Sequence, residues 1–317
     1  MWPFTDRSPL GISQVNLIRY LIVWRVNGSF AQLPRCLSLD ISRTLGTLIA
    51  ERLPTPQARP WRKAMTAWDG GERNKAQDTA PVPEAAWPIE VVLWPYPGKR
   101  AYGQGEPILW ELKLLGNDAD HGLFLEVILP AMEEAATTSD ERWHQPRTLW
   151  GRFDIQAVYV ARGPRWEPVV SNGRLDLSYR PTPIQWAEGL SFAAEGKRHF
   201  RKLTWLTPFD LNASSLCDLL DALMARMTLF QAGKRPTPEQ VWALLTPQEQ
   251  QSLRLDCEKG SLRYQTLEPA PKGWPGRWIG AQTFAVIPPG AVPYLELASI
   301  LHIGRQTHFG CGTFTLS

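Results

Sequence analysis

The chain has 317 residues, of which 44% are hydrophobic and 21% charged, so it is long enough for about two domains and has the composition of a folded protein. No apolar run approaches the roughly 18 residues that a membrane span needs, and residues 1–6 lack the basic and apolar regions of a signal peptide, so we expect a cytoplasmic protein with no membrane partner. The net charge of +3 is low for a nucleic-acid-binding protein, and such a role would have to come from local clusters of basic residues.

The first half of the chain predicts the order strand, helix, strand, strand, helix, strand. Strands are expected at 17–24, 89–94, 108–115 and 148–161, and helices at 38–53 and 123–136. Residues 55–88 are rich in proline, glycine and polar residues and are expected to form a long loop. This order is that of a ferredoxin-like fold, the scaffold of RNA-recognition domains.

The second half repeats the coarse order of elements. Strands are expected at 175–179, 203–206, 262–267, 277–287 and 313–316, and helices at 214–230, from Thr237 onward, and at 294–301. In the helix at 214–230, five apolar residues line one face: Leu216, Leu219, Leu220, Leu223 and Met227. We therefore predict an α+β protein with tandem ferredoxin-like domains, at residues 1–163 and 164–317.

Four cysteines, Cys36, Cys217, Cys257 and Cys311, lie far apart in the sequence. Without a C-x-x-C pair, neither a zinc ribbon nor a dithiol redox site is supported, and reduced, buried thiols are expected. Zinc coordination by His302, His308 and Cys311 would have an unusual spacing and no evident fourth ligand. No phosphate-binding loop, serine-hydrolase elbow or H-E-x-x-H motif occurs, and we expect no cofactor and no metal.

A glycine-rich segment, 302–312, lies between the last predicted helix and the last strand. Its Gly304, Gly310 and Gly312 lack a Cβ, so backbone amides there can approach an anion closely, and Arg305 adds a positive charge. A tight connection between helix and strand would explain some of the glycines. Three glycines together with an arginine favour the interpretation that the segment binds an anion, and RNA is the leading candidate for that anion.

A second basic cluster precedes the strand at 203–206. It consists of Lys197, Arg198, His199, Arg201 and Lys202. Strand alternation would place residues 197, 199 and 201 on one face, which concentrates charge there. RNA-backbone contacts and a solvated hairpin are both open interpretations. Arg35, before the first helix, is a further candidate RNA contact.

The C-terminal pattern L-H-I-G-R-Q-T-H-F-G-C-G resembles the glycine-rich signature of the CRISPR precursor-RNA-processing endoribonucleases of the RAMP superfamily. Three other stretches are similar to elements of that family: 203–211 with its Thr-Pro, 105–136, and 150–153. The resemblance implies a metal-independent reaction, in which the RNA 2′-hydroxyl attacks the adjacent phosphorus to leave a 2′,3′-cyclic phosphate. It also implies CRISPR repeat RNA or guide RNA as partner, and association with other effector subunits.

The family usually places a catalytic histidine near the first helix, but this chain has no histidine before His121. One alternative is that Arg43 on that helix and Tyr20 on the first strand act in cleavage. The other is that His302, His308 or His199 from the second domain approaches the scissile phosphate.

The leading hypothesis is an endoribonuclease that produces guide RNA. The alternative is a non-catalytic RNA-binding subunit of a CRISPR effector complex, and a third reading is a protein-interaction module with no nucleic-acid role. The small net charge favours the third reading slightly, but that reading leaves the glycine-rich segment and the basic cluster unexplained.

Overall fold

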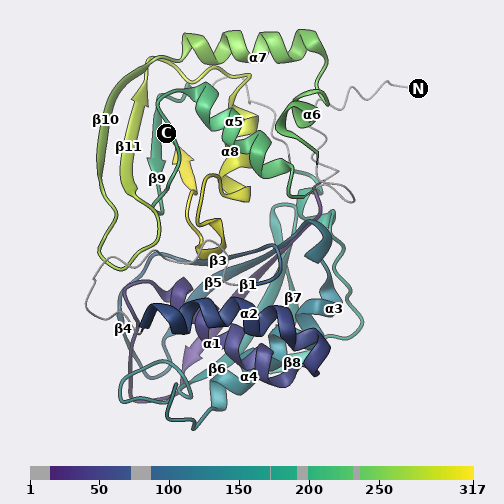
Figure 1. Cartoon of the computed structure of the whole chain (residues 1–317), viewed down its shortest axis with the longest axis vertical. Helices are drawn as coiled ribbons and strands as arrows, with labels where there is room; N and C mark the ends of the chain where they lie inside the picture. Colours follow the sequence, from purple (N-terminus) through teal and green to yellow (C-terminus); the bar gives the residue numbers. More distant parts are fainter. Residues whose placement is uncertain (1–14, 73–86, 172, 191–198, 231–235) are drawn as a thin grey trace. The chain divides into compact units, whose positions relative to one another are not determined.

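The computed structural model describes residues 15–72, 87–171, 173–190, 199–230 and 236–317 (Figure 1). Its contacts divide the chain into two compact units. We refer to Leu17–Trp186 as the N-terminal unit and to Ala187–Ser317, with which Val15 and Asn16 are grouped, as the C-terminal unit. The predicted domains meet instead at residue 163, so among the described residues the two divisions differ in 15–16 and 164–186.

The N-terminal unit is built on a six-stranded antiparallel sheet in the order β3-β5-β1-β6-β7-β8. These strands are β1 (Leu17–Val26), β3 (Val91–Pro95), β5 (Pro107–Leu115), β6 (Phe153–Arg162), β7 (Arg165–Ser171) and β8 (Arg174–Leu175). A separate pair joins β2 (Phe30–Gln32) to β4 (Ala101–Gly103). The central strand β1 pairs with β5 on one side and with β6 on the other.

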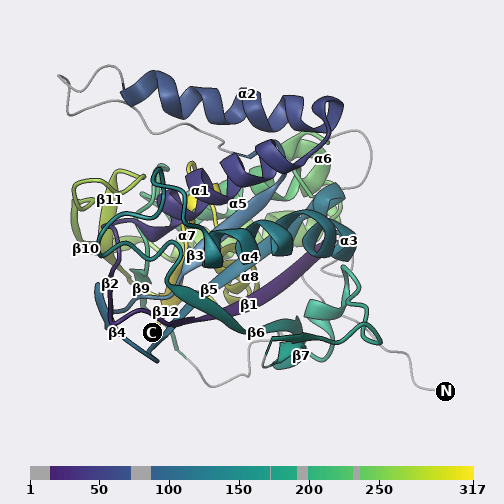
Figure 2. The same ribbon diagram turned by 90° about the horizontal axis from the view of Figure 1, so that it is seen from below.

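Helices lie against one face of this sheet (Figure 2). They are α1 (Leu37–Arg52) and the continuous helical stretch formed by α3 (His121–Leu123), the π-helical turn η3 (Phe124–Ile128) and α4 (Leu129–Thr137). Helix α2 (Thr55–Glu72) packs on the outer side of α1 (Figure 2). Alternate residues of β1 form the core, since Tyr20, Ile22 and Trp24 are fully buried. Tyr20 stacks on Phe124 with ring centroids 4.1 Å apart. The predicted strand-and-helix order is present, with a short 3-10 turn η2 (Gly116–Asp118) before α3.

The prediction of a loop over residues 55–88 is wrong for its first half, which forms α2. Pro60 lies inside this helix, and the proline and polar content of the segment led to the loop prediction. Tertiary packing overrides that local preference, because Ala58, Trp61 and Met65 recur at helical spacing and are buried. Gly46 of α1 leaves room for the Met65 side chain, since a Cβ at Gly46 would lie 2.7 Å from its sulfur atom. Residues 73–86 lie outside the described residues.

Two predicted strands are shorter than expected. The strand at 148–161 starts only at Phe153, because Gly151 turns the chain with φ of 72° and donates its amide to Ala135 O. The strand predicted at 175–179 is limited to β8, which ends at Leu175. The Asp176 carboxylate accepts hydrogen bonds from the amide and hydroxyl of Ser178, which forms a turn in place of a strand.

The C-terminal unit contains a four-stranded antiparallel sheet in the order β10-β11-β9-β12. Its strands are β9 (Lys202–Trp205), β10 (Leu262–Pro269), β11 (Trp278–Phe284) and β12 (Phe314–Leu316), and its helices are α5 (Leu216–Met227), α6 (Pro238–Trp242), α7 (Pro247–Lys259) and α8 (Val292–Leu301). Short 3-10 turns η4 (Gln185–Ala187) and η5 (Thr307–Phe309) complete the described elements. The predicted apolar face of α5 is buried along its whole length.

Three helices of this unit begin with a capping box, in which the N-cap side chain and the third helical residue satisfy each other's backbone amides. The N-cap residues are Ser215, Thr237 and Thr246. Helix α7, which Thr246 caps, was not predicted, because it buries only Leu253 and Cys257 and so lacks a clear apolar stripe.

All four cysteines are free thiols. Three are buried as predicted, and Cys217 is half-buried. No helix in the described ranges is long and apolar enough to cross a membrane.

Candidate nucleic-acid interface

The glycine-rich segment follows α8 and leads into β12. Its backbone adopts positive φ at Gly304 (93°), Gly310 (76°) and Gly312 (82°), and also at the non-glycine residues His302 and Gln306. A Cβ on Gly312 would lie 1.9 Å from Ile303 O, and one on Gly304 would lie 2.8 Å from the Leu211 side chain. The glycines are therefore required by the path of the backbone itself.

The amides of this segment donate mostly within the protein. Gly312 N donates to Pro208 O at 3.0 Å, Gly310 N to Thr307 O at 2.9 Å, and Arg305 N to Asp210 O at 3.1 Å. These three nitrogens are thus engaged, and Gly310 and Gly312 are buried. Gly304 and the Arg305 side chain are exposed, so they form the part of the segment that an anion in solution can reach.

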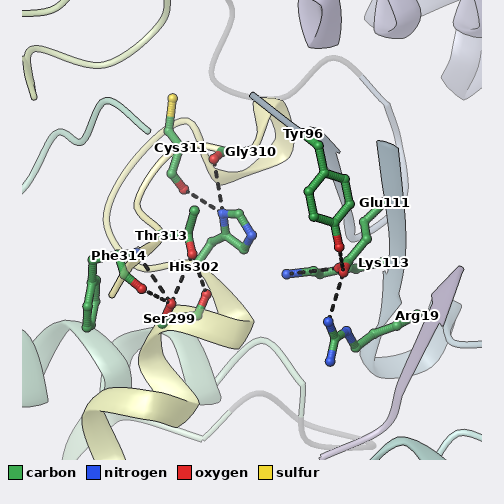
Figure 3. Close-up of polar contacts among 10 residues, drawn as sticks. All are labelled: Arg19, Tyr96, Glu111, Lys113, Ser299, His302, Gly310, Cys311, Thr313 and Phe314. Carbon is green, nitrogen blue, oxygen red and sulfur yellow. Dashed lines mark hydrogen bonds and ion pairs between the residues drawn. The ribbon is translucent and has the colours of Figure 1, made fainter. Parts of the chain in front are cut away.

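His302 is fully buried at the end of α8. Its Nδ1 lies 3.1 Å from both Gly310 O and Cys311 O, and the Ser299 hydroxyl nearby bonds to Phe314 and Thr313 (Figure 3). These contacts hold the two ends of the glycine-rich segment together. In the described structure the ring of His302 is a structural support of the segment.

His308 is also buried, within η5. Burial, and to a smaller degree the positive charge of Arg226, lowers the pKa of His308 to about 3. The ring is therefore neutral at neutral pH. Neither predicted histidine of the segment is presented to solvent.

The described part of the basic cluster is exposed. His199, Arg201 and Lys202 lie at the start of β9, where the Arg201 and Lys202 amides donate to Ser317 O at 3.0 and 2.8 Å. The two bonds fix the backbone beside the last strand and leave the cationic side chains at the surface. Lys197 and Arg198 lie outside the described residues.

In the N-terminal unit, the predicted residues are separate from one another. Arg35 is exposed before α1, whereas Arg43 is half-buried on α1. The Arg43 guanidinium lies 5.9 Å from the centroid of the Trp143 ring. Its charge also opposes the effect of burial on Asp40, whose pKa remains raised.

Tyr20 is fully buried, and its hydroxyl lies 2.9 Å from Nδ1 of His121. Burial, with the nearby charge of Asp120, raises the pKa of Tyr20 well above its usual value. The half-buried His121 was not predicted as a site residue. Burial, reinforced by Arg180, lowers its pKa although Asp120 opposes the shift. The sequence did indicate the position of His121 at the start of a helix, because Asp120, directly before it, is a typical N-cap residue.

A buried ionic cluster lies on the sheet face opposite Tyr20. Glu111 Oε1 accepts from Arg19 at 2.9 Å and from the Tyr96 hydroxyl at 2.9 Å, and Lys113 Nζ lies 3.5 Å from Glu111 Oε2 (Figure 3). Burial would raise the pKa of Glu111, but Arg19 and Lys113 outweigh it and the pKa is lowered. The cross-strand register of β1 and β5 brings these residues together. Sequence reasoning missed the cluster because Arg19, Glu111 and Lys113 each look like an isolated charge in an apolar strand, and Tyr96 lies outside the strands.

Within the described ranges, no group of three or more His, Cys, Asp or Glu side chains is arranged so that it could hold a metal ion.

Both units thus combine an antiparallel sheet with packed helices, which defines a mixed α and β protein. No protein-family model and no curated protein sequence matches the chain. Among solved structures, a partial Cas6-RT-Cas1–Cas2 complex matches with a TM-score of 0.50 at 12% identity, over 96% of this chain and 46% of that chain. A Cas6 product complex matches with a TM-score of 0.47 at 15% identity, over 95% of this chain and all (100%) of that chain.

Thermus thermophilus Cas6 matches with a TM-score of 0.44 at 14% identity, over 96% of this chain and 99% of that chain. The match at a TM-score of 0.50 shows that the chain shares its fold with about half of a chain of the Cas6-RT-Cas1–Cas2 complex. The resemblance to the CRISPR RNA-processing endoribonucleases, stated from the sequence, is confirmed at the level of the fold.

Proposed function

We propose that the chain is a CRISPR RNA-processing endoribonuclease with two ferredoxin-like domains, which binds the repeat RNA of a precursor transcript and cleaves it to give guide RNA. The observation that carries the proposal is the Cas6 fold, which matches over 96% of the chain. The sequence pattern of the glycine-rich segment supports it independently. The product guide remains bound, and through it the protein joins other CRISPR proteins.

The RNA backbone is proposed to contact exposed basic side chains of the C-terminal unit. These are Arg305 and the described part of the basic cluster, His199, Arg201 and Lys202. Gly310 and Gly312 act indirectly, because their amides donate to protein carbonyls and so hold Gly304 and Arg305 at the surface. Arg35 of the N-terminal unit is a separate candidate for RNA contact, and Lys197 and Arg198, which lie outside the described residues, are candidates from the sequence.

The proposed cleavage uses the RNA's own 2′-hydroxyl as nucleophile and needs no metal. As the oxygen attacks phosphorus, its proton passes to a base, the bond to the 5′-oxygen breaks, and that oxygen takes up a proton. Arg43, Tyr20, His302 and His308 remain candidates for these roles. We add His121, because its lowered pKa keeps the ring neutral and able to accept a proton.

The test is incubation of the protein with repeat RNA in excess chelator. We expect cleavage at one position, with a 2′,3′-cyclic phosphate on the upstream product. A single 2′-deoxy substitution at the nucleotide before the cut should abolish cleavage, whereas the same substitution elsewhere should not. Cleavage that persists in the first substituted RNA, or that requires added metal, would contradict the mechanism.

A non-catalytic RNA-binding subunit is the second candidate. It is favoured by the complete burial of Tyr20 and His302 and by the absence of a histidine from α1. Specific binding of repeat RNA without any cleavage would select this function over the endoribonuclease.

A further inference from the structure

A cavity of about 490 Å³ lies within the C-terminal unit, between the β10–β11 pair and the segment 209–214 that follows β9. Its volume falls in the range of roughly 300–1,000 Å³ that is typical of small-ligand sites. The residues used below are Phe209, Asn212, Gln265, Leu267, Trp278 and Gln282, all of which line it. None of them belongs to the RNA contacts proposed above.

The register of the two strands explains why the cavity exists. Gln265 pairs with Gln282, and Leu267 pairs with Gly280, so these four positions share one face of the sheet. Gly280 has no side chain to fill the space between Trp278 and Gln282. A Cβ there would lie 1.9 Å from Thr266 O, so the backbone at this position requires glycine.

The inner wall of the cavity is rigid and mostly apolar. Phe209 is buried and stacks on Trp205 with ring centroids 3.9 Å apart. Gln282 is buried as well, and both ends of its amide are used: its Oε1 accepts from the Trp205 indole at 3.0 Å, and its Nε2 donates to Ala213 O. This wall can support a flat ligand but has no free polar group to offer it.

The rim, in contrast, offers an aromatic surface and two amides. Trp278 is 39% exposed, although a large aromatic residue is normally more buried. Gln265 and Asn212 are exposed, and within the described part of the chain neither side-chain amide has a hydrogen-bond partner. A flat, heteroaromatic ligand with polar edges fits such a rim, since its face can stack and its edge can bond to amides.

Positive charge lies directly beside the cavity. Arg277 precedes Trp278, has 70% of its side chain exposed, and lies 4.0 Å from the Asp210 carboxylate. The backbone of Asp210 also accepts from the Arg305 amide. Two arginines therefore flank the segment that forms one side of the cavity, and both can attract a phosphate.

We propose that this cavity binds one unpaired base of the RNA, stacked on Trp278 with its edge toward Gln265 and Asn212, while Arg277 and Arg305 hold the adjoining phosphates. The inference rests on the proposed function, because it assumes that the chain binds RNA. It assigns to the β10–β11 pair a role in reading a single-stranded nucleotide.

Binding of fluorescein-labelled oligo(A), oligo(U) and oligo(C) to the full chain tests the proposal by fluorescence anisotropy. Trp278→Ala should weaken the best of the three about tenfold, as expected for loss of one base stack. Trp278→Phe should restore most of that loss. Gln265→Ala should alter the order of preference among the three RNAs.

Tyr264→Ala is the matched control. Tyr264 is 64% exposed on the same strand, and as the neighbour of Gln265 it points to the other face of the sheet. Equal losses of RNA affinity in Trp278→Ala and Tyr264→Ala, or no loss in either, would overturn the assignment of the cavity as a base-binding site. The proposed function would still stand in that case, provided that the wild type binds RNA. A wild type that binds none of the three RNAs and no repeat RNA would overturn both. Unchanged unfolding free energies of the variants show that folding is intact.

Discussion

His308 lies in the short turn η5, with 6% of the residue exposed. Its place in the glycine-rich segment made it a candidate acid or base. The sequence could not show that the segment folds inward, because that depends on contacts with Pro208 and Asp210, about a hundred residues earlier. The same holds for Tyr20, whose burial depends on Phe124 and His121.

The lowered pKa of His308 predicts a loss of stability in acid. The unfolded chain takes up a proton near pH 6.5, whereas the folded chain does not until about pH 3, so a fall in pH below 6.5 favours the unfolded chain. Lowering the pH from 7 to 5 should therefore reduce the unfolding free energy by roughly 2 kcal/mol through His308. Chemical denaturation at the two pH values measures the effect.

His308→Gln should lose correspondingly less stability over the same pH interval, and His199→Gln, at an exposed position, is the matched control. If all three proteins respond equally to pH, His308 is not held neutral by the fold.

Among the elements, those with an apolar stripe and a clear cap were predictable from the sequence. Helix α5 is the plainest case, with Ser215 and Asp218 at its start and a buried face along its length. Helix α2 was missed because proline dominated the local pattern, while its stability depends on Trp61 and Met65 packing in the core. Such cases are decided by burial against residues far away in the sequence, which a short stretch of sequence does not reveal.

The glycine-rich segment carries its own stability prediction. Gly312→Ala adds a methyl group 1.9 Å from Ile303 O at a φ of 82°. The left-handed conformation alone costs roughly 1–2 kcal/mol for a residue with a Cβ, and the clash adds to it, so a total of about 3 kcal/mol is expected. Urea denaturation measures the difference.

Gly189→Ala separates the two contributions. Gly189 belongs to the same unit and has a φ of 68°, but nothing lies within 4 Å of a Cβ placed there. Gly189→Ala should therefore lose only the part of the unfolding free energy that comes from placing a residue with a Cβ in the left-handed conformation. Equal losses at the two positions would mean that the contact with Ile303 is not what requires glycine at 312.

For the whole molecule, the net charge of +3 understates its suitability for RNA. The exposed Arg201, Lys202, Arg277 and Arg305 all belong to the C-terminal unit, so the proposed RNA contacts depend on individual exposed basic side chains and not on the net charge. The two-part organisation was predicted from the repeated order of elements. The limits of the two parts were less evident, since β7 is recognisable as part of the first sheet only through its pairing with β6.

This charge distribution predicts how RNA binding responds to salt. Each phosphate contact contributes roughly 0.7–0.9 to the slope of log affinity against log salt concentration. Arg305→Ala should lower the affinity for repeat RNA and reduce the slope by the contribution of about one phosphate contact. Arg59→Ala, at an exposed position of α2, is the control and should leave the slope unchanged. A slope that does not respond to Arg305→Ala would remove this residue from the proposed RNA contact.

The surroundings of His302 also settle which of its two tautomers is present. Backbone oxygens can only accept hydrogen bonds, and two of them lie 3.1 Å from Nδ1, so the ring hydrogen must reside on that nitrogen. In the uncharged imidazole, Nε2 then bears the lone pair. A neutral ring of this tautomer can take up a proton only at Nε2, and it has no acidic proton to give to a leaving oxygen.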